Sequence, residues 1–301
     1  MRPERLRPNR VYRFYRGGAL IDRLRNEQEQ DNEYPEDWLG SVVAANNPGR
    51  DEPFAGLSRL ESGPFLRDEI RKQPERWGTP NLLVKLLDPV ERLPVHAHPD
   101  REFALRELGS DYGKTEAWIV VETRAAQAEV WLGLRDSVSR EQYREWIDEQ
   151  NTDALLESLN SLTVRAGDVI FIPAGVPHAI GAGALLVEVQ EPSDFSIICE
   201  WQGFPIAPED SHLGLGWDRA IEALSLDAYD PVFGMPENEF FSVDDRAEPA
   251  GRFGVLLVLE GEGELAGERV RRGDAFVLPA ACERFETRGN FNVIRCLGGD
   301  L

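Results

Sequence analysis

One stretch of the chain occurs twice, and this repeat constrains the fold more than any other feature. Residues 164–178 read VRAGDVIFIPAGVPH, and residues 270–284 read VRRGDAFVLPAACER. Six identities share an offset of 106 residues: Val164, Arg165, Gly167, Asp168, Pro173 and Ala174 recur as Val270, Arg271, Gly273, Asp274, Pro279 and Ala280. A fixed offset over this many identities indicates that a structural unit has been duplicated.

Each copy reads as a turn, a strand and a second turn. Gly-Asp predicts a tight turn, an apolar strand follows, and Pro-Ala predicts the second turn. We expect that turn to deliver the next side chain to the interior, which is His178 in the first copy and Arg284 in the second. We therefore expect the two copies to share a backbone structure, but to present different side chains to the interior.

Short apolar runs bounded by Gly, Pro, Asp and Asn recur along the chain and predict a mainly β protein, built as a sandwich or a barrel. The predicted strands are 82–87, 117–121, 128–132, 169–172, 184–189, 255–259, 275–278 and 291–296.

Residues 137–160 depart from this pattern, because they read as two short helices. Ser139, followed by Gln142 three residues on, predicts the cap of the first helix. Asn151 or Thr152 predicts the cap of the second, and its apolar residues share one face. This helical insert could be a substrate lid, or a surface excursion without a role.

The net charge of −21 restricts the possible partners. Nucleic acid and an anionic membrane surface would both be repelled, so we expect neither as a partner. Lysine occurs only as Lys72, Lys85 and Lys114, and the remaining cationic side chains are arginines. An acidic, lysine-poor surface fits either a salt-rich cytoplasm or a GC-rich genome.

Cysteine usage and hydropathy predict an intracellular protein. The chain has three cysteines, Cys199, Cys282 and Cys296, an odd number without metal-type spacing, so we expect inert core thiols rather than a disulfide framework. Residues 1–10 are polar and arginine-rich, and no apolar run approaches the ~18 residues of a membrane helix. We therefore expect a soluble, cytoplasmic protein, either a monomer or a homodimer.

Three of the four histidines occupy positions that suit a metal site. His96 and His98 stand two apart, so strand alternation places both on one face, and His178 follows the turn described above. Glu116 opens the strand after His98 and is the natural carboxylate to complete the set. Neutral imidazoles bind zinc, iron, nickel and manganese. The fourth histidine, His212, lies in a polar linker, where we expect it to be solvated.

The motifs around these residues resemble known families. GDVIFIPAGVPH fits the second cupin motif, G-x5-P-x-G-x2-H. NLLVKLLDPVERLPVHAHPD followed by GKTEAW, together with GLSRL near residue 57 and VLEGEGEL…GDAFVLPA near the C-terminus, resembles the type I phosphomannose isomerases (mannose-6-phosphate isomerases) in their short prokaryotic form.

This resemblance implies two fused cupin (jelly-roll) β-barrels with a small helical insert. The implied divisions are a metal-binding N-terminal cupin domain, 1–204, a linker, 205–236, and a degenerate C-terminal cupin domain, 237–301. N-terminal segments could complete the second barrel. With Arg284 in place of the histidine and no H-x-H pair, the second barrel is expected to be free of metal.

The resemblance also implies an activity, a zinc-dependent aldose–ketose isomerase that converts mannose 6-phosphate to fructose 6-phosphate. The family's metal ligands match His98, Glu116 and His178, and His96 stands where the fourth ligand is normally a glutamine. One divalent metal is implied, zinc foremost, with iron, nickel or manganese as alternatives.

The implied catalytic residues are Lys85 and Lys114, which match the family's two active-site lysines, and Glu36 of an E-x-W segment. A bound metal would lower the pKa of Lys114, while Lys85 could stabilise anionic charge or shuttle protons. Glu36 could act as an acid, as a base or as an orienting group. The catalytic base stays unassigned, and the alternative is that Lys85 merely ends a strand and Lys114 merely occupies a turn.

Two departures weaken the phosphate end of the implied site. The family has an arginine in a segment like SDTTYRVYDW, whereas this chain reads SDFSIICEW and places Ile197 or Ile198 there. Pro94 stands where a small hydroxyl residue is usual. Arg165 or another arginine could substitute. The alternatives are an isomerase or epimerase acting on a non-phosphorylated or different sugar, and a non-catalytic, metal-dependent sugar-binding cupin.

Overall fold

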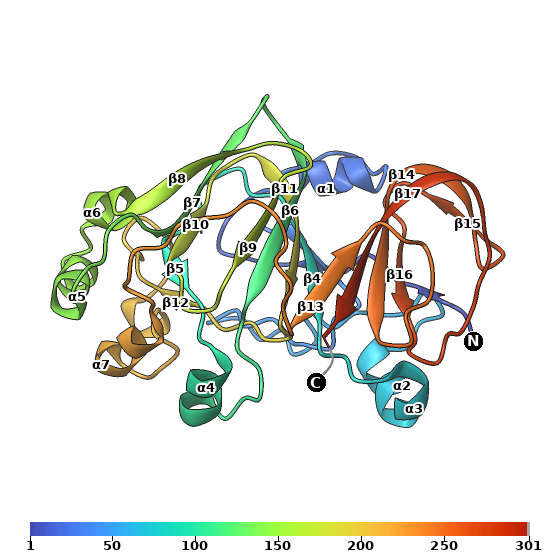
Figure 1. Ribbon diagram of the computed structural model, residues 1–301, viewed down its shortest axis with the longest axis horizontal. Coiled ribbons are helices and arrows are strands. Elements are labelled where there is room, and N and C mark those ends of the chain that lie inside the picture. The colour runs from blue at the N-terminus through green and yellow to red at the C-terminus, as the bar shows by residue number, and fades with distance from the viewer. Residues whose placement is uncertain (300–301) are drawn as a thin grey trace.

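The computed structural model describes residues 1–299, whose strands form three antiparallel sheets (Figure 1). The histidine sheet has the order β12-β5-β10-β7-β8 (Ile197–Ile198, His96–Ala97, His178–Ile180, Ala128–Leu134 and Leu159–Val164). The central sheet has the order β2-β3-β4-β11-β6-β9 (Arg10–Val11, Glu36–Leu39, Leu83–Leu87, Ala184–Gln190, Glu116–Thr123 and Val169–Ile172). The C-terminal sheet has the order β1-β16-β14-β17-β13, with β15 on β14 (Glu4–Arg5, Ala275–Leu278, Gly254–Leu265, Thr287–Gly298, Phe241–Asp244 and Glu268–Arg271).

Short helices lie around these sheets. They are α1 Ala19–Leu24, α2 Leu66–Lys72, α3 Pro74–Trp77, α4 Arg101–Phe103, η1 Ala104–Leu108, α5 Arg140–Asp148, α6 Thr152–Glu157, η2 Pro208–Asp210, α7 Trp217–Ala220 and η3 Ile221–Ala223. Within residues 1–299, no helix combines the length and the apolar character needed to cross a membrane.

The central sheet is buried on both faces, and this explains its nearly continuous apolar strands. On one face, Trp118 and Leu186 pack with Leu132 and Ile180 of the histidine sheet. On the other face, alternate residues of β4 and β11 pack with the C-terminal sheet, in a core that includes Val84, Leu86, Val187, Val255 and Ile294. The molecule is thus a row of three packed sheets, with the C-terminal sheet at the right of Figure 1. The mainly β architecture expected from the sequence is confirmed.

All the predicted strands form, and two of them, β9 and β16, have the expected bounds. Strands β14 and β17 are each 12 residues long, so the predicted ranges 255–259 and 291–296 were too short. The segment EGEGE at 260–264 looks like a turn but is paired along β17, because its glycines allow the two backbones to approach closely. A Cβ added at Gly261 would lie only 2.2 Å from the carbonyl oxygen of Asn290.

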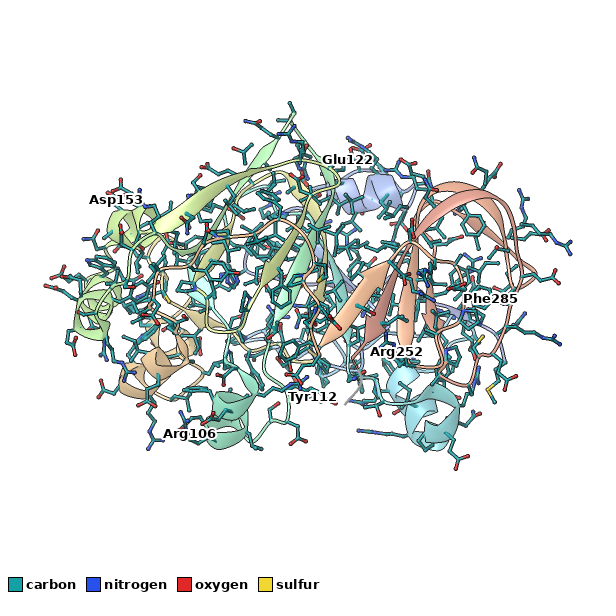
Figure 2. All side chains as sticks on the ribbon, viewed as in Figure 1. Arg106, Tyr112, Glu122, Asp153, Arg252 and Phe285 are labelled. Carbon is teal, nitrogen blue, oxygen red and sulfur yellow. The ribbon has the colours of Figure 1, made fainter. Side chains whose placement is uncertain are left out.

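The two helices of the insert begin where their caps predict. The Ser139 hydroxyl accepts from the Gln142 N–H at the start of α5, and the Asn151 side chain accepts from the Ala154 N–H at the start of α6. The Gln142 side chain turns to Glu145 instead of the Ser139 backbone, so the reciprocal half of the capping box is not made. Asp153 of α6 lies at the outer edge of the molecule in Figure 2.

Segments far apart in the chain join the C-terminal sheet to the rest. Strand β1 at the N-terminus pairs with β16, so the first residues of the chain complete the C-terminal sheet. Glu122, labelled in Figure 2, pairs with Arg23 of α1 at 2.6 Å and with Arg272 at 3.4 Å. The divisions 1–204, 205–236 and 237–301 stay a prediction, and the last two residues of the third lie outside the described range.

Both copies of the sequence repeat fold into the same turn. Asp168 accepts a hydrogen bond from the Arg165 N–H at 2.9 Å, and Asp274 accepts one from the Arg271 N–H at 2.9 Å. Their surroundings differ. A Cβ added at Gly167, with φ +94°, would meet open space, whereas one at Gly273, with φ +89°, would lie 2.4 Å from the carbonyl oxygen of Leu24. The second turn is therefore docked tightly against the end of α1.

We expect Gly273→Ala to destabilise the protein by about 1–3 kcal/mol more than Gly167→Ala, as measured by urea unfolding. Both variants force a side chain onto a left-handed backbone, so this cost cancels in the comparison. Only Gly273→Ala also pushes a methyl group into the backbone of residues 24–25. Equal losses in the two variants would contradict the tight docking of the second turn.

Candidate metal centre

Three buried histidines of the histidine sheet meet at one point. His96 pairs with His178 across β5 and β10, and His98 follows β5 directly. Ring nitrogens of His96, His98 and His178 all lie within 4.8 Å of one another. Each Nδ1 contacts a backbone carbonyl oxygen at 2.8 Å, those of Pro94, Phe195 and Val176 respectively. Because Nδ1 is the donor in each case, each Nε2 is the unprotonated nitrogen, whose lone pair can bind a metal as in metal-binding histidines.

Glu116, the first residue of β6, brings a carboxylate from the central sheet to this cluster. Its Oε2 lies 3.3 Å from His98 Nε2, and its Oε1 lies 3.5 Å from His178 Nε2. The indole N–H of Trp118 donates to Oε1 at 3.0 Å. His178 Nε2 is buried without a hydrogen bond, and so is Glu116 Oε2, although the Lys114 ammonium lies 3.0 Å from that oxygen as an ion pair. His178 Nε2 lies close to the Glu116 carboxylate, and buried acceptors held together without a donor or cation between them are costly, so these residues fit a metal ion.

Burial sets the protonation states of the cluster. It lowers the pKa of His98 to about 3, and it lowers those of His96 and His178 below their ordinary value. Burial alone would raise the pKa of Glu116, but the charge of Lys114 above all holds it well below its ordinary value. Neutral imidazoles and an ionised carboxylate are the forms that bind divalent cations.

The Lys114 side chain is buried at the centre of the site, which argues against the alternative that Lys114 merely occupies a turn. Its ammonium donates to His98 Nε2 at 2.9 Å and lies 3.0 Å from Glu116 Oε2. Burial disfavours the ammonium, but Glu116 and Glu188 raise the pKa of Lys114 overall. The expected lowering of this pKa applies to the metal-bound site and stays a prediction. A metal held by His98 requires Lys114 to release this nitrogen.

Lys85 lies in the middle of β4, not at its end, and is equally buried. Its Nζ lies 3.1 Å from Glu188 and 3.7 Å from Asp194, and 4.7 Å from the ring centroid of Trp38. The register of the central sheet causes the first contact, because Glu188 of β11 stands directly opposite Lys85.

Glu36 is held by two hydrogen-bond donors and one ion pair. The Trp38 indole N–H donates to it at 2.7 Å and the Tyr15 hydroxyl at 2.5 Å, while Arg13 Nε lies at 3.0 Å. Burial opposes its charge, but Arg13 and Lys85 lower the pKa of Glu36 overall. A carboxylate held and ionised in this way is a poor base, so the structure favours the orienting role over acid–base work.

Arg13, Glu188 and Asp194 also belong to the site, and sequence reasoning missed them. Arg13 Nη2 donates to Asp194 at 2.8 Å. Arg13 and Lys85 bring the pKa of Asp194 to about 2 in spite of its burial. Burial, and then the charge of Glu116, raises the pKa of Glu188. A single acid within the apolar run 184–189 was a signal for Glu188, whereas nothing in the sequence marked Arg13.

A cavity of about 210 Å³ adjoins the cluster, and His96, Lys114, Lys85, Glu188 and Glu36 line it. Its wall includes Pro94 and Ile198, the latter being one of the two isoleucines that can stand at the position of the family arginine, whereas Arg165 is exposed and does not line the cavity.

No residue of 137–160 lines the cavity, so the structure gives no support to a substrate lid, which stays a prediction. The insert packs instead on a side core through Tyr143, Ile147 and Leu155.

His212 lies outside the cluster, but the expectation of a solvated linker residue was wrong. It is half-buried, its Nδ1 accepts from the Gly216 N–H at 3.1 Å, and its ring packs edge-on against Trp217. The three cysteines are buried free thiols, as expected.

Comparisons with known proteins show which proteins the chain is similar to. No family model matches the chain. The chain is 34% identical over 274 residues to the probable mannose-6-phosphate isomerase GmuF of Bacillus subtilis, covering 78% of this chain and 83% of that protein. It superposes on the crystal structure of mannose 6-phosphate isomerase from Bacillus subtilis with a TM-score of 0.76 and 26% identity, over 98% of this chain and 99% of that one. A mannose 6-phosphate isomerase bound with zinc and yttrium shares the fold, with a TM-score of 0.70 and 15% identity over the full length of both chains.

We expect the metal-free protein to lose stability as the pH falls from 7 to 5, by up to about 2 kcal/mol for each buried histidine. The unfolded chain takes up protons near pH 6.5, whereas the folded histidines, with their lowered pKa values, stay neutral. Acidification therefore favours the unfolded state. Urea unfolding at several pH values measures this loss, which should be smaller in His178→Gln. A flat profile over this range would contradict the buried, neutral cluster.

Proposed function

The chain belongs to the mannose-6-phosphate isomerase family, and on this premise we propose that it is a metal-dependent isomerase that converts mannose 6-phosphate to fructose 6-phosphate. The observation that carries the proposal is the convergence of three neutral imidazoles and an ionised carboxylate on one buried point, beside two buried lysines and a cavity.

We propose that His96, His98, Glu116 and His178 hold one divalent metal. Three imidazoles and a carboxylate suit zinc, and also iron, nickel and manganese, and a relative of the same fold holds zinc. When bound, the metal supplies Lewis-acid polarisation of the sugar oxygens at C1 and C2. His96 adds an imidazole where the family pattern has a glutamine.

The side chains of the cavity supply the rest of the chemistry. Isomerisation moves a proton between C1 and C2, so anionic charge develops on oxygen and must be stabilised. The ammonium groups of Lys85 and Lys114 lie within 4 Å of Glu188 and are buried, where their charges are effective. They are the candidates to stabilise this charge. Glu36 anchors Arg13, Tyr15 and Trp38 around the cavity.

Glu188 is the best-placed proton acceptor in the cavity. Its raised pKa brings it closer to neutral pH, where a carboxylate is most effective as a general base. It also stands between the two ammonium groups, which can return the proton. This role completes an acid–base set that the motifs alone left without a base.

One feature favours a second candidate, an isomerase or epimerase of a non-phosphorylated sugar. Pro94 and Ile198 line the cavity and offer no hydrogen-bond donor to a phosphate group. The first assay should therefore compare a phosphorylated with a non-phosphorylated sugar.

We expect the zinc-loaded protein to produce fructose 6-phosphate from mannose 6-phosphate, and His178→Gln to lose its zinc together with nearly all activity. His212→Gln is the matched control, because His212 lies outside the cluster. A coupled assay and metal analysis measure both quantities, with free mannose in parallel, at low and at high salt. Bound zinc without turnover of either sugar would refute the isomerase proposal.

We expect Glu188→Gln to lower kcat by about 10²–10⁴-fold while the zinc content stays unchanged. The amide cannot accept the proton but fills the same space. Glu200→Gln serves as the control, since Glu200 is a buried carboxylate paired with Arg92 outside the cavity. Activity close to that of the unmodified protein in Glu188→Gln would assign the base elsewhere.

A further inference from the structure

The cavity extends beyond the metal cluster to two segments near the N-terminus. Residues 12–15 and residues 46–48 and 50 line it, together with the lysines of the site. Each of these segments contributes one guanidinium, Arg13 and Arg50. The cationic lining is therefore divided between the lysines beside the cluster and the two arginines.

Arg13 is buried but has hydrogen-bonding capacity left. Two carboxylates fix its guanidinium, Glu36 at 3.0 Å from Nε and Asp194 at 2.8 Å from Nη2. Nη1 makes only long contacts of 3.4 Å to the backbone oxygen of Asn46 and to the side-chain oxygen of Asn47. Nε is buried without a hydrogen bond. The guanidinium is thus held rigidly at the cavity wall, with Nη1 available to a ligand.

Arg50 adds a more exposed cation. Its guanidinium carbon lies 3.7 Å from the centroid of the Tyr12 ring, and its side chain is 36% exposed. It pairs with the similarly exposed Glu52, and such surface pairs hold their partners weakly. An anion in the cavity can therefore compete for Arg50 at little cost. Because two carboxylates already flank Arg13, a phosphate dianion needs this second cation.

Asp194 connects Arg13 with the segment in which the family pattern has its active-site arginine. Asp194 and Ile198 belong to the same SDFSIICEW segment, and both line the cavity. Ile198 provides no cation, but Asp194 binds the guanidinium of Arg13, which lies 181 residues away in sequence. A guanidinium therefore reaches the cavity next to this segment, although it comes from another part of the chain.

We propose that Arg13 and Arg50 form the end of the cavity that binds the phosphate group of a hexose 6-phosphate, in place of an arginine at Ile198. The inference rests on the proposed isomerase function and specifies the substrate end of the same site. Guanidinium groups bind phosphate through paired N–H donors, which a point charge such as lysine does not reproduce. The apolar wall at Pro94 and Ile198 then contacts the sugar ring, not the phosphate.

The first test compares Arg50→Ala with Arg59→Ala in the zinc-loaded full chain. Arg59 is the matched control, because its guanidinium also stacks on a ring, 3.5 Å from the centroid of Phe65, but lies outside the cavity. We expect Arg50→Ala to raise the KM for mannose 6-phosphate about tenfold with kcat changed less than twofold, and Arg59→Ala to change neither. An unchanged KM in Arg50→Ala would overturn the inference and leave the isomerase proposal intact.

The second test measures binding of inorganic phosphate by calorimetry, which needs no turnover. Arg13→Lys keeps the charge between Glu36 and Asp194 but loses the forked donor, so the variant should fold and bind phosphate several-fold more weakly. Should the unmodified protein turn over no sugar, the isomerase proposal fails, while phosphate binding that weakens in Arg13→Lys and Arg50→Ala would still support the anion site. Phosphate binding that is equal in all variants would refute it.

Discussion

Glu116 is a fully buried carboxylate, and balancing its charge determines how the whole site is built. Burying an ionised carboxylate is expensive unless cations or donors surround it. Here Lys114, two imidazoles and the Trp118 indole approach it, and a divalent metal would complete the balance. The neighbouring charges follow the same rule, because each buried cation of the cavity stands beside a buried carboxylate.

These charges form a continuous chain from the metal cluster to the N-terminal segment. Lys114 contacts Glu188, Glu188 contacts Lys85, Lys85 contacts Asp194, and Asp194 contacts Arg13. Such alternation fixes the orientation of each side chain through its two neighbours, so substitution of one member disturbs the others. The site is therefore preorganised by electrostatics, and its members should not be treated as independent.

The scaffold makes this arrangement possible by burying the central sheet on both faces. Packing of the C-terminal sheet against the outer face covers β4 and β11, whose inner faces carry Lys85 and Glu188. The C-terminal repeat has Arg284 in place of the histidine, and in the described residues it adds no side chain to the metal cluster. Its contribution is to exclude water from the far side of the sheet that holds the charges, which keeps their interactions strong.

The sequence by itself determined the features that depend on local spacing. Strand periodicity indicated the mainly β fold, and the caps placed the helices of the insert. The site residues were identified from the H-x-H pair, the turn before His178 and the strand start at Glu116, and the structure brings these residues together. Only the tertiary structure decided which distant residues meet. Arg13 and Asp194 are 181 positions apart, Glu188 faces Lys85 through sheet register, and the insert of 137–160 packs away from the cavity. Local periodicity specifies which face of a strand or helix a side chain occupies. Pairing between strands and packing between sheets depend on burial and charge balance over the whole chain, which no single segment encodes.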